Sequence, residues 1–415
     1  MNILYINHYA GSRLHGMEFR PWFMAKRWAQ AGHRVTIAAS SFSHLRTKNP
    51  ELNGRKFAEQ QLDGIRYFWI AGPAYHGNGM GRIKNMLSFL CGLYRYEKEL
   101  TKPDPPDAVI ASSTYPLDIY PAYHIAKKYG ASLVYEVHDL WPLSPIELGG
   151  MSPKHPYIRV MQAAENYCYK HSNRVVSLLP NAKEHMMEHG MAPEKFVYVP
   201  NGIERADWEK PFGDPPVYSD QLSRYHQQGE FLIGYAGAHG IANALDSFVE
   251  AGELLRGKKI RLLLVGPGPE RERLIQKAKD KGLDDVVTFL PPVGRGQIPE
   301  LLSQMDALYI GLQRQPLFRF GVSPNKLMDY MMAAKPVIFA IDAPNDMVAE
   351  AKCGVSIPPE DSKAIARAAE QLAALPKDRL EAMGRRGHEY ILQNNEYDVL
   401  SQRFLEALRQ GKKQS

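Results

Sequence analysis

The chain has 415 residues, 44% apolar and 23% charged, with a net charge of +6 from 51 basic and 45 acidic side chains. This length suits two domains of roughly 200 residues each, with enough apolar residues for two packed cores. The mild positive charge suits anionic small molecules or an acidic membrane surface. It disfavours nucleic acid as a partner, because duplex binding calls for a concentrated basic stripe.

The cysteines, the N-terminus and the hydropathy of the chain predict the cellular compartment of the protein. Cys91, Cys168 and Cys353 lie far apart in the sequence and form no C-x-x-C pair. We therefore expect no disulfide framework, no zinc site and a reducing cytoplasm. The first residues run directly into the apolar segment Ile3–Ile6 without a basic region, so we expect no signal peptide. No uncharged apolar stretch reaches the about 18 residues that a membrane span needs.

Short apolar runs alternate with helical patterns through the first half of the chain, starting in strand, helix, strand order. This alternation predicts a parallel, doubly wound sheet. The first helix is expected over residues 17–31, and the strands over residues 3–7, 35–39, 65–70, 108–111, 133–137, 174–177 and 197–199.

The loop Tyr9–Gly16 follows the first expected strand and contains Gly11 and Gly16. Glycines at this place let the backbone approach a ligand at the carboxyl end of a strand. An ordinary tight connection between strand and helix is the alternative.

The segment Gly81–Leu100 has a helical pattern whose apolar residues lie on one side. These residues are Ile83, Met86, Leu87, Leu90 and Leu93, with arginines and lysines elsewhere. Such a helix can lie on an anionic membrane, or it can simply pack on its own sheet.

The stretch YEVHDLWPLSP, residues 135–145, is the most informative part of the first half. An expected strand leads directly into His138 and Asp139, at the carboxyl end where open α/β sheets bind their ligands. Asp139 can orient His138 or cap the next turn. A histidine that is merely hydrogen-bonded at a strand end is the alternative.

The second half repeats the α/β pattern. We expect strands over residues 231–236, 261–265, 286–290, 307–310, 337–340 and 354–357, a helix beginning near residue 242, and final helices over residues 361–374 and 378–410.

Two glycine turns of the second half follow expected strands. The loop GAHGIAN begins with Gly237, Ala238 and His239, and its backbone amides can meet a diphosphate. The turn Gly266-Pro267-Gly268 fails as a dinucleotide fingerprint because Arg271 stands where a third glycine is required. The sequence therefore disfavours an NAD enzyme.

The segment GVSPNKLMDYMMAAKPVIFA, residues 321–340, contains a polar turn, a short helix and a buried strand. Ser323 is the expected N-cap and Pro324 the first helical residue, which leaves the N–H groups from Asn325 onward to face an anion. Lys326 and Asp329 project from nearly the same face, a cation for phosphate and a carboxylate for sugar hydroxyls. A solvated ion pair between them is the alternative.

This segment resembles the signature of family 4 of the retaining GT-B-fold glycosyltransferases, which use nucleotide sugars. The stretch at residues 135–145 resembles the phrase E-V-x-D-L-W-P-x-S of a bacterial polysaccharide-assembly branch of that family. The resemblance implies an α/β, GT-B fold with two Rossmann-like domains facing a central cleft. It places the acceptor-side domain at residues 1–201, the nucleotide-sugar domain at 202–390, and a C-terminal helix packing back on the first domain at 391–415.

The resemblance also implies roles for individual residues. His138 falls beside the reacting sugar, and Asp329 on the second of two signature glutamates, which binds the ribose. Gly321 stands where the first glutamate usually contacts the donor sugar. The remaining donor residues implied are Gly11 and Gly16, Gly237 to His239, Gly266 and Gly268, with Pro292 and Val293 beside the nucleobase. Arg295 and Arg319 are further candidates for the phosphates.

The chemistry expected is group transfer from a nucleotide carrier. The chain has no D-x-D triplet, so we expect no metal and no other cofactor, and the catalytic residues to be His138, Asp139 and Lys326. The partners expected are a nucleotide-sugar donor, with UDP favoured, a lipid-linked or glycan acceptor, and an anionic membrane surface. The alternatives are a GT-B-fold sugar-nucleotide epimerase and a non-catalytic nucleotide-binding protein.

Overall fold

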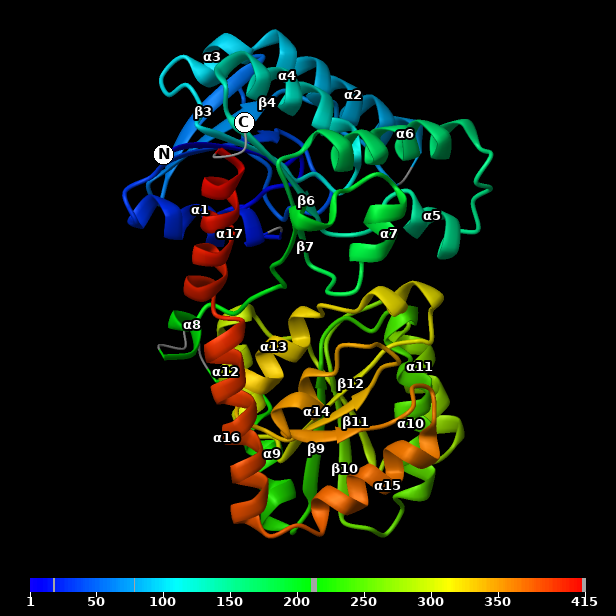
Figure 1. The fold of residues 1–415 in the computed structure, drawn as a ribbon. Coiled ribbons are helices and arrows are strands. Elements are labelled where there is room, and N and C mark those ends of the chain that lie inside the picture. The colour runs from blue at the N-terminus through cyan, green and yellow to red at the C-terminus, as the bar shows by residue number, and fades with distance from the viewer. Residues whose placement is uncertain (18, 78, 210–214, 413–415) are drawn as a thin grey trace. The chain divides into compact units, whose positions relative to one another are not determined.

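A computed structural model describes residues 1–17, 19–77, 79–209 and 215–412. The chain divides into two compact units, unit 1 formed by Met1–Pro200 with Tyr397–Ser415, and unit 2 formed by Asn201–Glu396. Each unit is an α/β domain with its own sheet (Figure 1). Residues 413–415 of the expected C-terminal helix lie outside the described residues.

Unit 1 contains a sheet of eight described strands in the order β3-β4-β2-β1-β5-β6-β7-β8. All neighbouring pairs are parallel except β3 and β4, which are antiparallel. The strands are β1 Asn2–Ile6, β2 Arg34–Ser40, β3 Phe57–Leu62, β4 Ile65–Ile70, β5 Ala108–Ala111, β6 Ser132–Val137, β7 Arg174–Ser177 and β8 Phe196–Tyr198.

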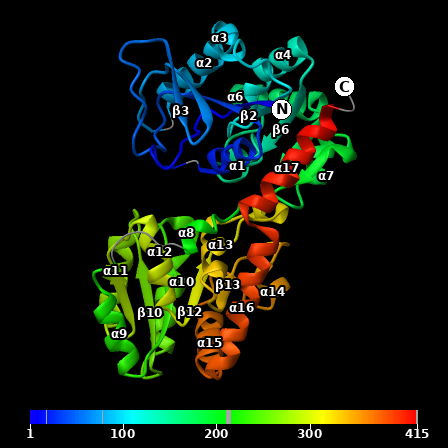
Figure 2. The same ribbon diagram turned by 90° about the vertical axis from the view of Figure 1, so that its left-hand side faces the viewer.

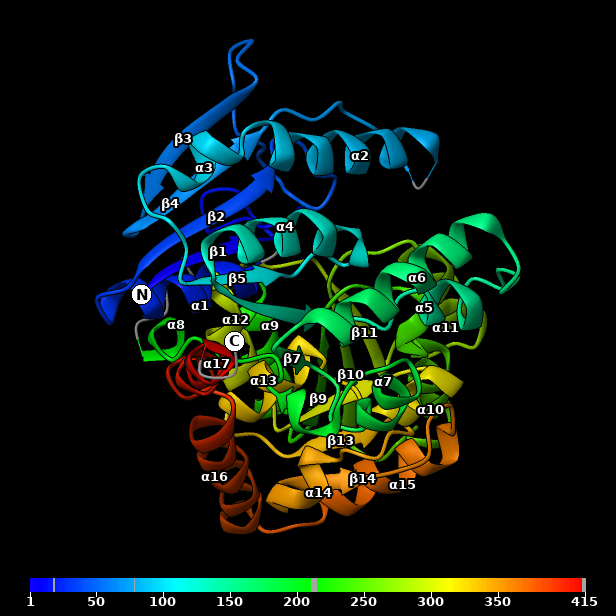
Figure 3. The same ribbon diagram turned by 45° about the horizontal axis from the view of Figure 1, so that its top comes forward.

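Helices cover both faces of this sheet, which explains why β4, β5 and β6 are buried at every position. Helices α1 and α17 pack together on one face through side chains such as Trp28 and Phe404. Helices α2, α4 and α6 lie side by side (Figure 3). The helices are α1 Phe19–Gln30, α2 Met80–Arg95, α3 Glu97–Thr101, α4 Ile119–Tyr129, α5 Leu143–Glu147, α6 Pro156–His171, α7 Lys183–Glu188 and α17 Tyr397–Lys412, with 3-10 turns at Pro116–Asp118 and Pro193–Lys195.

Unit 2 contains a sheet of six described strands, all parallel, in the order β11-β10-β9-β12-β13-β14. The strands are β9 Phe231–Ala236, β10 Ile260–Val265, β11 Val287–Leu290, β12 Ala307–Gly311, β13 Val337–Ala340 and β14 Gly354–Ser356.

One face of the unit 2 sheet packs against α10, α11 and α15, which lie at the right of this unit in Figure 1. The other face packs against α9, α12, α13, α14 and α16, and Figure 2 shows α16 running alongside α13 and α14. The helices are α8 Ala206–Glu209, α9 Ser219–Gln227, α10 Leu245–Leu254, α11 Arg271–Asp280, α12 Ile298–Ser303, α13 Asn325–Met332, α14 Met347–Ala351, α15 Ser362–Ala373 and α16 Lys377–Asn394. Shorter 3-10 turns are η3 Ile241–Asn243, η4 Arg295–Gln297 and η5 Pro316–Phe320.

The structure corrects three expected elements. Strand β3 was not predicted, and it is an edge strand with several solvent-facing polar side chains rather than a buried apolar run. The helix expected over residues 378–410 is two helices, because Asn395 ends α16 and uses its carbonyl and side chain to bind Ile203 and Asn201. The helix expected over residues 81–100 likewise divides into α2 and α3 at Tyr96.

The apolar side of α2 is mostly packed. Met86 and Leu93 are buried, whereas Leu87 is half exposed. The helix therefore packs on its own unit. Among the described residues, none of the helices combines the length and apolar character that crossing a bilayer requires.

Candidate active site

The signature segment of unit 2 forms η5, a short turn, α13 and β13. Helix α13 begins at Asn325, one residue later than expected, and its N-cap is Pro324, not Ser323. Ser323 is engaged elsewhere, because its Oγ accepts a hydrogen bond from the Asn201 N–H at 2.9 Å and its carbonyl accepts from the Asn201 amide at 2.8 Å. The N–H groups of Asn325 and Lys326 donate to no other described residue. They point outward at the positive end of the helix.

Lys326 lies in the first turn of α13, with its ammonium group held by neutral partners. Its Nζ donates to the Tyr235 hydroxyl at 3.0 Å and to the Asn243 side-chain oxygen, and it lies 4.9 Å from the Tyr235 ring centroid. Burial lowers the pKa of Lys326 to about 8. No described carboxylate lies within ion-pair distance of this cation. The site around Lys326 therefore has a half-buried positive charge that an anionic ligand would neutralise.

Two glycine turns pack against each other beside Lys326. The loop after β9 touches the lysine stem, since a Cβ on Gly237 would lie 2.6 Å from the Lys326 Cδ. In the turn after β10, Gly266 and Gly268 have φ of +143° and +153°, and a Cβ on them would lie 2.1 Å and 2.4 Å from the carbonyls of Gly237 and His239. The glycines of the V-G-x-G turn are thus required by this close approach.

The glycine loop offers fewer free amides than expected. The Gly237 N–H donates to Val265 at 2.9 Å and the His239 N–H donates to Pro267 at 2.7 Å, so neither can donate to a ligand. The N–H groups of Ala238 and Gly240 donate to no other described residue. Only part of this loop can therefore contact a diphosphate through its backbone.

His239 adds a second group without a protein partner. Its side chain is fully buried, and within the described ranges neither ring nitrogen has a hydrogen-bond partner. Burial lowers the pKa of His239 to about 4, and the nearby charges of Arg271 and Lys326 act in the same direction. The ring is therefore neutral at pH 7 and has one N–H to donate.

Asp329 lies one turn after Lys326 and is not free. Its two carboxylate oxygens accept hydrogen bonds from Arg295 at 2.6 and 2.7 Å, in a bidentate ion pair. Burial raises the pKa of Asp329, although Arg295 opposes the shift. The structure thus excludes the solvated pair between Lys326 and Asp329. It also corrects the expected phosphate role of Arg295, whose guanidinium is occupied by this carboxylate.

Gly321 has φ of +98° and ψ of 173°, a conformation that is essentially restricted to glycine. A glutamate at this position, as in the family signature, would therefore be strained in the backbone conformation that Gly321 adopts.

Arg319, the other arginine considered for the phosphates, donates to the Pro316 carbonyl at 2.7 Å and lies over the Phe320 ring.

Pro292 and Val293 follow β11, as expected from the sequence. Pro292 is exposed, whereas Val293 is half-buried against the core of unit 2. The Tyr218 hydroxyl fixes this turn by donating to the Pro291 carbonyl at 3.3 Å.

His138 of unit 1 stands directly after β6, next to a buried carboxylate that the sequence analysis did not identify. Its Nε2 lies 3.0 Å from the Ser112 Oγ and 3.4 Å from Glu136 Oε2. Glu136 is fully buried, accepts from Arg20 at 2.9 Å and from Ser112 at 2.6 Å, and also accepts from the Tyr5 hydroxyl. These contacts fix the orientation of the His138 ring.

Burial alone would raise the pKa of Glu136, but the Arg20 guanidinium and the hydrogen bonds from His138 and Ser112 hold it well below its usual range. Glu136 is therefore ionised at neutral pH. Arg20 also donates to the carbonyls of Val199 and Pro200. These hydrogen bonds connect α1 to the last residues of the Met1–Pro200 segment of unit 1.

Asp139 has neither of the positioning roles considered for it. It is exposed and makes no hydrogen bond with another described residue. Helix α5 begins after Pro142 without a side-chain cap, so Asp139 does not cap it. The orientation of His138 comes from Ser112 and Glu136 instead.

The loop Tyr9–Gly16 is anchored within unit 1. The Gly16 N–H donates to the Ser12 carbonyl at 2.9 Å, so this amide is not available to a ligand. Gly11 packs against the carbonyls of Gly16 and Met17, and its own carbonyl accepts from the Tyr67 hydroxyl at 2.7 Å. Arg13 and Leu14 form the exposed tip of the loop.

Family models match both halves of the chain. The model described as "Glycosyl transferase 4-like domain" matches residues 15–202, and the model described as "Glycosyl transferases group 1" matches residues 230–374. The chain belongs to the group 1 glycosyltransferases.

Solved structures support the same fold for this group 1 glycosyltransferase. Sucrose-phosphate synthase from Thermosynechococcus elongatus is 16% identical with a TM-score of 0.71, and the match covers 100% of both chains. HepE from Anabaena, in complex with UDP, is 15% identical with a TM-score of 0.67, covering 99% of this chain and 100% of that one. WaaG, a glycosyltransferase involved in lipopolysaccharide biosynthesis, is 16% identical with a TM-score of 0.63, covering 96% and 98%. These likenesses establish a GT-B fold. No curated protein sequence matches the chain.

Two groups of residues in this glycosyltransferase were missed by sequence reasoning. Tyr235 contacts Lys326, and its signal was a polar aromatic residue just before the glycine loop. Glu136 was the single charged residue in the buried strand β6, a pattern that usually marks a paired, buried charge. Tyr5, Arg20 and Ser112 come from separate segments, so no local pattern reveals them.

Proposed function

We propose that the chain transfers a sugar from a UDP-sugar donor to a lipid-linked or glycan acceptor, with retention of anomeric configuration and without a metal ion in the transfer step. The observation that carries this proposal is Lys326, a half-buried cation with neutral partners at the N-terminus of α13. A diphosphate would supply the missing negative charge. Structures similar to this chain include HepE in complex with UDP and with UDP-glucose, which supports a uridine nucleotide as the donor.

Unit 2 would stabilise the leaving group. As the bond between the anomeric carbon and the diphosphate oxygen breaks, negative charge grows on the diphosphate. In this proposal, Lys326 and the N–H groups of Asn325 and Ala238 would stabilise that charge. The acceptor oxygen bonds the anomeric carbon on the face that the diphosphate leaves, and the hydroxyl proton passes to a diphosphate oxygen.

Unit 1 would supply His138 beside the reacting sugar. The ionised Glu136 and the Ser112 hydroxyl hold the imidazole at the carboxyl end of β6. A histidine oriented by a carboxylate keeps one tautomer and tolerates the positive charge that develops on an oxocarbenium-like sugar. Asp139 is exposed beside it and can contact the acceptor without orienting His138.

We place the reaction in bacterial polysaccharide assembly, such as exopolysaccharide, capsule or O-antigen synthesis, at the cytoplasmic face of the membrane. The support is the YEVHDLWPLSP stretch and the fold shared with WaaG. Leu87 and Tyr94 on α2 are exposed large apolar side chains that can contact such a surface.

Gly321 keeps two alternatives in view, a GT-B-fold sugar-nucleotide epimerase and a non-catalytic nucleotide-binding protein. One experiment separates the three functions. The purified chain is incubated with UDP-glucose and UDP-N-acetylglucosamine, with and without a lipid-linked saccharide extract. Transfer predicts release of UDP that depends on the acceptor, whereas an epimerase converts the donor without an acceptor. Binding of the nucleotide sugar without any turnover, whether or not the saccharide extract is present, would support the non-catalytic nucleotide-binding protein and reject the transferase.

A further inference from the structure

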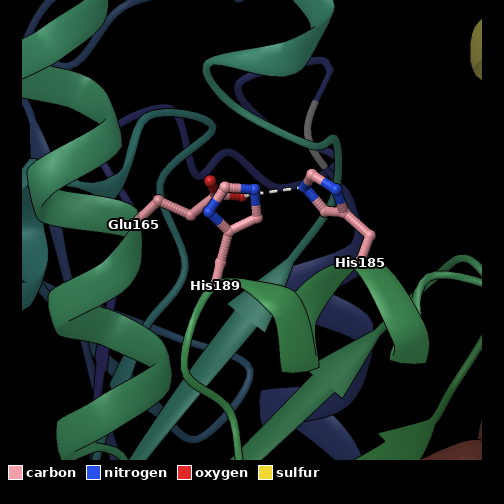
Figure 4. A group of neighbouring side chains, drawn as sticks. All are labelled: Glu165, His185 and His189. Carbon is pink, nitrogen blue, oxygen red and sulfur yellow. Dashed lines mark ion pairs between the residues drawn. The ribbon is translucent and has the colours of Figure 1, made fainter.

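Two helices of unit 1 bring three metal-ligand side chains together. Glu165 lies on α6, and His185 and His189 lie one turn apart on α7 and its C-cap. The three side chains point toward one another in Figure 4, with one ligand atom from each within 4.8 Å of the others. Glu165 Oε1 and His185 Nε2 are 3.9 Å apart, and the two imidazole ring centroids are 4.5 Å apart.

We propose that Glu165, His185 and His189 form a binding site for a divalent transition-metal ion of the zinc type. Two imidazoles and one carboxylate are an established ligand set for Zn²⁺, which leaves a fourth position for water. Ligand atoms around a tetrahedral zinc lie about 3.3 Å apart, given metal–ligand distances near 2 Å. The observed separations reach this value through small side-chain rotations.

The surrounding residues hold the three ligands in place. Tyr169 donates to Glu165 Oε1 at 2.8 Å, and Gln162 donates to Oε2 at 2.7 Å. Gln162 also lies 3.1 Å from His189 Nδ1, which is 3.2 Å from the Asn166 side-chain oxygen. Because these contacts engage His189 Nδ1, they leave His189 Nε2 for the metal ion. Hydrogen bonds to the outer nitrogen orient ligand histidines in this way in metal sites.

The burial of the Glu165 carboxylate favours a bound cation. The Glu165 side chain is only 1% exposed, so its charge calls for a nearby cation.

The ion would have a structural role. Helix α6 leads into β7 and α7 follows it, and Ser177 at the end of β7 pairs with Val137, the residue before His138. A metal joining α6 to α7 would fix the segment around the carboxyl end of β7. This site consists of unit 1 residues alone and shares no residue with the Lys326 cluster of unit 2.

The test measures Zn²⁺ binding to the untagged full chain after EDTA treatment, by competition with a chromogenic chelator. A Cys91→Ser background removes the exposed thiol, which could itself bind zinc. We expect one Zn²⁺ per chain and an affinity at least 100-fold weaker in His185→Ala and in His189→Ala. The matched control is His33→Ala, which removes another half-buried histidine, one that contacts the N-terminal amine, and should bind as the parent does.

Two further measurements guard against misfolding of the variants. Glu165→Gln keeps the shape of the side chain, and its melting temperature in EDTA reports whether the fold is intact. With an intact fold, we expect Zn²⁺ to raise the melting temperature of the parent chain but not of this variant. Co²⁺ should give the intense visible absorption of a tetrahedral site in the parent chain only. Failure of the parent chain to bind a stoichiometric ion, or equal binding by parent and folded variants, would overturn the proposal.

Discussion

Glu136 of unit 1 is fully buried and Lys326 of unit 2 is half-buried, but of the two only Glu136 has a counter-charge among the described residues. Arg20 pairs with Glu136 at 2.9 Å, and three further groups hydrogen-bond or contact the carboxylate. Lys326 has a hydroxyl and an amide oxygen as partners and, among the described residues, no carboxylate. A cluster with balanced charge stabilises the fold and positions its neighbours. A positive cluster without a counter-charge favours an anionic ligand, which supports our proposal that the donor binds to unit 2.

The comparison predicts the largest stability loss at Glu136. Glu136→Gln keeps the side-chain shape but leaves the Arg20 guanidinium buried without its partner, so unit 1 should lose about 3–5 kcal/mol. Differential scanning calorimetry resolves this as a lower unfolding temperature. The control is Asp398→Asn, which removes an exposed partner of Arg27 and should change stability by less than about 1 kcal/mol. A loss at Glu136 no larger than the loss at Asp398 would mean that the buried Arg20–Glu136 pair contributes no more to stability than an exposed ion pair.

Lys326→Met should have the largest effect on activity. It keeps the apolar stem and removes the cation that would stabilise the leaving diphosphate, so donor-dependent turnover should fall about 10²–10³-fold. Steady-state kinetics with the preferred UDP-sugar measure this loss. Lys377→Met, at a side chain that is 91% exposed, should leave turnover unchanged. Equal activity of the two variants would remove Lys326 from the site.

The unpaired lysine also predicts how stability depends on pH. The pKa of Lys326 is about 8 in the folded chain against an ordinary value of 10.5, so the unfolded state binds more protons between these values. Stability should therefore rise with pH from about 8 to about 10.5, by up to roughly 3 kcal/mol. Chemical denaturation of the wild-type chain and Lys326→Met across this range isolates the contribution, since other groups titrate in both. A difference between the two chains that stays constant with pH would contradict a lowered pKa.

The smallest effect is expected at Asp329, which is engaged by Arg295 but retains lone pairs for a ribose hydroxyl. Asp329→Asn should weaken nucleotide binding about tenfold, or about 1.4 kcal/mol, as loss of one charged hydrogen bond does. Titration calorimetry with UDP measures the change. Asp342→Asn breaks an exposed pair with Arg314 and serves as control. Weaker folding of unit 2 with unchanged UDP affinity would limit Asp329 to its pairing with Arg295.

Much of the fold could be predicted from local patterns. The strands at residues 65–70, 108–111, 174–177, 231–236 and 337–340 match the structure at both ends, because each is a short and mostly apolar run whose side chains are buried almost throughout. β3 was missed because an edge strand has polar side chains on its open face. The end of α16 at Asn394 was missed because its cause is a tertiary contact between Asn395 and Asn201.

The candidate site residues could be predicted where they lie together in one short sequence motif. Lys326, Asp329 and His138 were identified from short motifs, and their placement on α13 and after β6 agrees with the expected elements. Their partners were not predictable, since Arg295 lies 34 residues from Asp329 and Tyr235 lies 91 residues from Lys326. The Ser323 cap failed for the same reason, because a distant asparagine takes its hydroxyl.

The most direct test of the central claim is the proton uptake that accompanies UDP binding. Titration calorimetry at pH 8 in buffers of different ionisation enthalpy gives the number of protons exchanged. If Lys326 has a pKa of about 8 and receives the diphosphate, binding should take up about half a proton in the wild-type chain and none in Lys326→Met. His138→Ala should show the same uptake as the wild-type chain. Binding without proton exchange, at equal affinity in the wild-type and Lys326→Met chains, would show that Lys326 does not receive the anion.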